Sequence, residues 1–100
     1  MDRLLLVSPP APESVPPAGA SFRVPMDAEA VRASVCGELR IVSSDADPYN
    51  PVGAGTLYGA ALTCAVDIIP GAGHITPDDG YGPWPALEAW CVGDTPTVGR

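Results

Sequence analysis

The sequence contains no lysine and only one histidine, His74. All five basic residues are arginines, so neither a Schiff-base lysine nor the lysine of a phosphate-binding loop is available. Twelve acidic residues give the chain a formal net charge of -7. Because binding to a nucleic-acid backbone depends on basic side chains that displace counterions, this charge balance argues against nucleic acid as a partner.

Closely spaced cysteine pairs are also lacking. Cys36, Cys64 and Cys91 are odd in number and far apart, which predicts neither a disulfide framework nor a zinc site. We expect these residues to be buried free thiols. The glycine-rich stretch GAGTLYG lacks the lysine and the serine or threonine of a phosphate loop. The sequence therefore predicts no metal and no cofactor.

The amino-terminal apolar run is short. Residues 1–7 carry one arginine and a few apolar side chains, too few for the core of a signal peptide and far too few to span a bilayer. We therefore expect no membrane partner and a cytoplasmic location.

Apolar runs and helix-type patterns alternate along the chain. Runs at residues 4–7, 38–42 and 65–69 predict strands, and the patterns at residues 28–35, 52–62 and 84–91 predict helices. This order favours an α/β fold with three parallel strands and flanking helices, and 100 residues allow one small domain. On the predicted helix 84–91, we expect Trp84, Leu87 and Cys91 to share one face.

Two segments lack the pattern of regular structure. Residues 8–25 are too rich in proline for a helix interior or a central strand, so we expect an extended loop there. Residues 92–100 contain glycine and proline, and we expect a frayed tail.

Acidic residues and the histidine follow two successive predicted strands. Asp45 and Asp47 come after residues 38–42, and His74 comes after residues 65–69. In a parallel sheet, catalytic groups gather at the carboxyl ends of strands, so these side chains are expected to meet. An aspartate at that place can hold one imidazole tautomer and stabilise the imidazolium. We favour Asp47 as the partner of His74 because Pro48 fixes its backbone, and expect one of the two aspartates to bond only backbone amides.

Three stretches carry a family resemblance. SSDADPYNP, VDIIPGAGHI and GYGPWP together resemble the carboxyl-terminal part of small α/β-hydrolases of the YdeN and retinoblastoma-binding-protein-nine type, which are serine hydrolases. The resemblance covers roughly Leu4 to Cys91 and is strongest from Ser43 to Trp84. It implies that Asp47 is the triad aspartate and His74 the triad histidine. LLLVSPP resembles the strand that follows the nucleophile strand in that family.

The nucleophile of such a triad is missing from the pattern. These enzymes carry the serine upstream of the acid, in a Gly-x-Ser-x-Gly turn between a strand and a helix. No such motif occurs in the sequence, and the serines that precede Asp47 lack flanking glycines: Ser8, Ser14, Ser21 and Ser34. We therefore expect residues 1–91 to form the carboxyl-terminal half of an α/β-hydrolase domain that is inactive without its other half.

Two functions remain open from the sequence. The first is a serine hydrolase acting on small ester or acyl substrates, with Asp47 and His74 completed by an amino-terminal half. The second is a non-catalytic binding module or relic of the hydrolase scaffold. Such a module would use the edge of the strand at residues 4–7, through a partner or self-association, or a surface formed by Tyr81, Trp84 and Trp90.

Overall fold

The computed structural model describes residues 1–11 and 27–100 and contains one parallel sheet. Its strands are β1 (Arg3–Val7), β2 (Glu38–Ser44) and β3 (Ala65–Ile69), in that spatial order. Leu4 pairs with Leu39 across β1 and β2, and Ile41 pairs with Val66 across β2 and β3. The predicted α/β class and parallel sheet are confirmed. Most of the proline-rich segment predicted as a loop, together with Ser14 and Ser21, lies outside the described residues.

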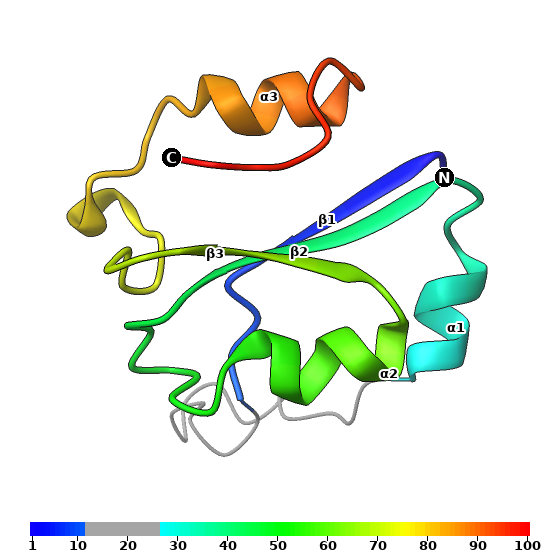
Figure 1. Cartoon of the computed structure of the whole chain (residues 1–100), viewed down its shortest axis with the longest axis horizontal. Helices are drawn as coiled ribbons and strands as arrows, with labels where there is room; N and C mark the ends of the chain where they lie inside the picture. The colour runs from blue at the N-terminus through cyan, green and yellow to red at the C-terminus, as the bar shows by residue number, and fades with distance from the viewer. Residues whose placement is uncertain (12–26) are drawn as a thin grey trace.

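Helices cover both faces of this sheet (Figure 1). On one face lie α1 (Ala28–Ala33) and a continuous helical segment made of a π-helical turn, η3 (Gly55–Gly59), and α2 (Ala60–Leu62). On the other face lies α3 (Pro85–Cys91), after a short 3-10 turn, η4 (Pro77–Asp79). The helices predicted at residues 28–35, 52–62 and 84–91 are thus present with slightly shorter bounds. Asp27 caps α1 as its residue type suggests, because its carboxylate accepts the N–H of Ala30.

The strands divide their side chains between two apolar cores. Successive residues of a strand point to opposite faces, so Leu39 and Ile41 of β2 pack toward α1 and α2, whereas Val42 packs toward α3. Buried residues of the first core are Val35, Leu39, Ile41, Ala54 and Leu62. Buried residues of the second are Val42, Ile69, Ala72, Tyr81, Trp90 and Val98. Because the sheet is covered on both faces, the side chains of β1 form a continuous apolar run in the sequence.

The buried face of α3 differs from the predicted one by one position. Trp90 is the buried residue of the helix, at 1% exposure, and Cys91 is exposed. Trp84 and Leu87 pack at the edge of the same core, as predicted. The guanidinium of Arg3 lies 4.3 Å from the centre of the Trp90 ring, so the aromatic face is covered by a cation.

The cysteines are not buried as expected. Cys36 and Cys91 are exposed and Cys64 is partly buried, and all three are free thiols. Cys36 lies just before β2, where its thiol donates to the Met1 carbonyl. The small size of the domain leaves its helix ends and turns at the surface, and two of the thiols lie there.

The carboxyl-terminal segment is not frayed, contrary to the prediction. Val98 is only 3% exposed and its N–H donates to the Asp67 carboxylate at 2.7 Å. The Trp84 indole N–H donates to the Gly99 carbonyl at 2.7 Å. In Figure 1 this segment turns back after α3 and runs alongside it over the sheet. One buried valine and two long-range hydrogen bonds thus hold a segment whose composition alone suggests a loose end.

Candidate active site

The carboxylate of Asp47 is buried in the turn that follows β2. The residue is 5% exposed, and its Oδ1 accepts the backbone N–H of Tyr49 at 2.9 Å. This contact closes a tight turn around Pro48, because an aspartate side chain readily accepts the amide two residues ahead. The turn thereby fixes one carboxylate oxygen and leaves the other, Oδ2, pointing out of the loop.

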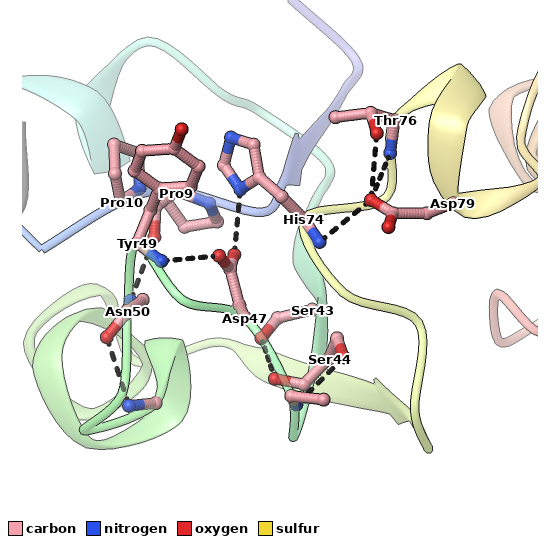
Figure 2. A network of polar contacts seen from close by, with 12 residues as sticks. Pro9, Pro10, Ser43, Ser44, Asp47, Tyr49, Asn50, His74, Thr76 and Asp79 are labelled. Carbon is pink, nitrogen blue, oxygen red and sulfur yellow. Dashed lines mark hydrogen bonds and ion pairs between the residues drawn. The ribbon is translucent and has the colours of Figure 1, made fainter.

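The imidazole of His74 meets that second oxygen. His74 lies in the segment after β3, and its Nδ1 is 2.9 Å from Asp47 Oδ2 (Figure 2). A carboxylate can only accept, so this contact places a proton on Nδ1. Nε2 then carries a lone pair and has no hydrogen bond to any other residue in the described ranges, and the ring side chain is 30% exposed. The free nitrogen is therefore available as a base.

Tyr49 covers one face of the histidine. Its ring centre lies 4.7 Å from that of His74, with the planes tilted by 50°. Tyr49 is itself 40% exposed, so it forms a wall between the imidazole and solvent on that side. The loop of Asp47 thus supplies both the acid and an aromatic neighbour of the base. The sequence pattern gave Tyr49 no role.

Asp45 does not reach the histidine. Its Oδ1 accepts the backbone N–H of Gly71 at 2.8 Å, and the side chain is at the surface. This bond ties the loop that carries Asp47 to the segment that carries His74. One aspartate thus contacts the imidazole and the other holds a backbone amide, the division expected from the sequence.

No serine hydroxyl in the described part of the chain contacts His74. Ser34 donates to a carbonyl of its own helix, and Ser43 and Ser44 bond within their own strand end. Ser8, at the end of β1, has a positive φ of 48° and a buried hydroxyl that has no partner among the described residues. It is followed by two prolines rather than by a helix. The residues described here therefore hold an acid and a base, with no nucleophile on the base.

A cleft formed by described residues lies apart from this pair. A cleft of about 310 Å³ is lined mainly by the loop and helix that follow β2, and neither Asp47 nor His74 contributes to it. Its lining residues are Ser44, Asp45, Asn50, Pro51, Val52, Gly53, Gly55, Thr56 and Ile68.

Within residues 1–11 and 27–100, no three histidine, cysteine or acidic side chains group in a way that could hold a metal ion. No helix in those ranges is long and apolar enough to cross a membrane.

The family is decided by comparison with known proteins. The model of the serine hydrolase family matches residues 1–91 of the chain. This chain belongs to the serine hydrolase family. No curated protein and no solved structure is similar enough to count as a match. The matched range includes Asp47 and His74, and it ends at the last residue of α3.

Asp79 was missed by the sequence reasoning, although it contacts the histidine segment. Its Oδ2 accepts the backbone N–H of His74 at 3.1 Å and both the N–H and the hydroxyl of Thr76. The signal was present in TPDD, because a threonine followed three residues later by an acid is a capping box at the start of a helical turn. The turn is only three residues long, so no helical periodicity marks it.

Proposed function

We propose that this chain supplies the acid and the base of a serine hydrolase that cleaves small esters or related acyl compounds. The observation that carries the proposal is the 2.9 Å contact between His74 Nδ1 and Asp47 Oδ2, with Nε2 unpaired among the described residues. The family match supports the reaction class, and the three sequence stretches support the YdeN and retinoblastoma-binding-protein-nine type. In this assignment, Asp47 and His74 are two members of a triad.

The geometry suits general-base chemistry. Nε2 of His74 takes the proton of a serine hydroxyl as the serine oxygen attacks the acyl carbon, and later gives this proton to the leaving alcohol. The Asp47 carboxylate holds the ring in the productive tautomer and stabilises the imidazolium between these steps. Burial of Asp47 keeps water from competing for the Nδ1 proton.

In our proposal the serine comes from outside these 100 residues. β1 pairs with β2 along one edge, and no other described residues form a strand on its free edge. Among the described residues, none forms a strand against the outward-facing backbone N–H and C=O groups of β1, which includes the apolar residues Leu4, Leu5 and Leu6. A parallel strand added there would end at the same side of the sheet as Asp47 and His74. A serine turn that follows such a strand would then lie next to the base.

The test is assembly with a complementary half. The 100-residue chain is co-expressed with the amino-terminal half of a serine hydrolase of this family, which carries a strand followed by Gly-x-Ser-x-Gly. Hydrolysis of p-nitrophenyl acetate and labelling by a fluorophosphonate probe are measured for each piece and for the pair. We expect the pair to be active and each piece to be inactive. His74→Ala should lower the activity of the pair by about 10²- to 10⁴-fold.

Asp78→Ala is the matched control, because Asp78 is exposed and makes no side-chain hydrogen bond within the described ranges. It should leave the rate of the pair unchanged. A pair that binds but does not hydrolyse the ester, or a rate that survives His74→Ala, overturns the assignment. Labelling of the chain by itself would place the nucleophile inside it and reject the two-piece arrangement.

A binding module without catalysis is the second candidate, and the free edge of β1 favours it. The aromatic surface that this function could have used is not present, since Tyr81 and Trp90 are buried in the core beside α3. The strand edge therefore carries this candidate, either toward a partner or toward a second copy. A stable complex with the complementary half that shows no hydrolysis would support it.

The free thiols fit a reducing compartment, so we propose the cytoplasm for either function.

A further inference from the structure

The backbone on both sides of His74 adopts an unusual conformation. Gly73 has φ of 62° and Ile75 has φ of 56°, both in the left-handed region. Glycine adopts that region freely, but a β-branched residue such as isoleucine is a rare occupant and is strained there. A segment of this kind keeps its shape only when surrounding contacts hold it. The histidine that faces Asp47 therefore depends on something that fixes its own main chain.

The Asp79 carboxylate bonds the backbone on both sides of the strained residue. Its Oδ2 accepts the N–H of His74 at 3.1 Å, the N–H of Thr76 at 3.1 Å and the Thr76 hydroxyl at 2.8 Å. The first two of these donors flank Ile75 directly. Figure 2 shows the single oxygen at the meeting point of the three bonds, on the far side of His74 from Asp47.

Gly73 leaves the space that this carboxylate occupies. A Cβ built on Gly73 would lie 2.5 Å from Asp79 Oδ1 and 2.8 Å from its carboxyl carbon. Any larger residue at position 73 would thus push the carboxylate away, in addition to adopting an unfavourable φ. The left-handed glycine, the strained isoleucine and the carboxylate form one arrangement around the histidine backbone.

We propose that Asp79 is a positioning residue that holds the His74 backbone so that Nδ1 stays on Asp47. The inference rests on the proposed function, since it assigns the support of the base in that same site. The hydroxyl bond from Thr76, followed by the backbone bonds from Thr76 and His74, holds the pKa of Asp79 below its usual value. The group is therefore an anion at neutral pH and accepts all three bonds.

The test reads the imidazole directly, because His74 is the only histidine in the sequence. Long-range proton–nitrogen correlation spectra of the uniformly ¹⁵N-labelled full chain report which ring nitrogen carries the proton. The wild type should show the Nδ1-protonated tautomer and a downfield Nδ1 proton. Asp79→Ala should lose that signal and mix the two tautomers, while the backbone amides of β2 and β3 keep their positions. Asp79→Asn, which retains an acceptor oxygen, should restore it.

Asp78→Ala removes the same charge from the same turn and should behave as the wild type. An Asp79→Ala chain that is folded and keeps the wild-type tautomer overturns the proposal. If Asp79→Ala does not fold, Thr76→Val is measured instead, because it removes only the hydroxyl bond to Asp79. An unchanged Nδ1 signal in Thr76→Val likewise overturns the proposal. These spectra need no second polypeptide and no ester. Loss of the positioning role and failure of the hydrolase assignment are thus observed separately.

Discussion

Asp47 Oδ2 and His74 Nδ1 lie 2.9 Å apart, although the two residues are separated by 27 positions in the sequence. The parallel pairing of β2 and β3 is the cause. Ser44 pairs with Ile69, so Asp47 stands three residues and His74 five residues beyond a matched pair of strand ends. The hydrogen bond that the Gly71 N–H donates to Asp45 then draws the two loops together. The contact thus results from short loops on adjacent strands, and no local sequence pattern marks it.

Replacement of Asp47 by asparagine should disable the base without removing it. The amide of Asp47→Asn can donate to Nδ1, which favours the Nε2-protonated tautomer, and that tautomer cannot take a serine proton. A change of this kind lowers the rate of a serine triad by roughly 10⁴-fold. We expect a loss of that order in the assembled pair, with the tautomer change visible in the His74 spectrum of the chain alone. Asp78→Asn is the control, and an unaltered rate in Asp47→Asn would contradict the role given to Asp47.

The carboxyl-terminal segment should depend on Asp67. This carboxylate, partly buried on β3, accepts the Val98 N–H at 2.7 Å and pairs with Arg40 at 2.9 Å. Arg40 also bonds Glu38, so Asp67→Ala leaves it one acidic partner and leaves the Val98 amide without an acceptor. We expect a loss of about 1–3 kcal/mol in the free energy of unfolding, measured in urea. Hydrogen exchange at Val98 should accelerate as well.

Asp94→Ala is the matched change for that experiment, since Asp94 is exposed and its side chain has no bond within the described ranges. It should cost less than about 0.5 kcal/mol. Equal losses in the two variants would show that Asp67 does not hold the segment.

The sequence predicted much of the fold because its signals are local. Apolar runs marked the strands, and their alternation with helical patterns marked a parallel sheet. The Asp47 and His74 contact followed from that topology. The order of the 92–100 segment did not, because it depends on a hydrogen bond that Asp67 accepts and one that Trp84 donates, and no local pattern predicts either. The role of Asp79 was not predicted for the same reason, since its hydrogen bonds lie in a three-residue turn.

Two glycines of the helical segment after β2 should respond in opposite ways to alanine. A Cβ on Gly55 would meet Val66 methyls at 3.8 and 3.9 Å, which is ordinary contact, whereas one on Gly59 would lie 2.9 Å from a Val66 methyl. Gly55→Ala should therefore stabilise the chain by about 0.5–1 kcal/mol through helix propensity. Gly59→Ala should destabilise it by about 1–3 kcal/mol, because Val66 is stiff and already packed. Thermal and urea unfolding measure both, and stabilisation by both would refute the crowding at Gly59.

The three thiols should differ in reactivity. Burial raises the pKa of the Cys64 thiol by more than the positive charges of Arg32 and Arg40 lower it. A smaller fraction of this thiol is therefore thiolate at mildly alkaline pH than for an unperturbed cysteine. Cys36 and Cys91 are exposed. Alkylation by iodoacetamide, followed by mass spectrometry, should modify two sites quickly and Cys64 slowly. In urea the three rates should converge, and a Cys64 that reacts fastest in the native chain would be inconsistent with its burial.

Acid should weaken the support that Asp79 gives to the histidine segment. Its folded-state pKa is lowered from 3.8 by its hydrogen bonds, chiefly the one from the Thr76 hydroxyl. A lowered folded pKa means that the ionised carboxylate stabilises the fold above the unfolded-state pKa, and that this contribution is lost as the pH falls through the folded-state pKa. The free energy of unfolding of the wild type should therefore exceed that of Asp79→Asn by more at about pH 6 than at about pH 2.5. Asp78→Asn controls for the loss of one charge from the same turn. A gap between wild type and Asp79→Asn that stays constant across this pH range would mean that the Asp79 charge does not stabilise the segment.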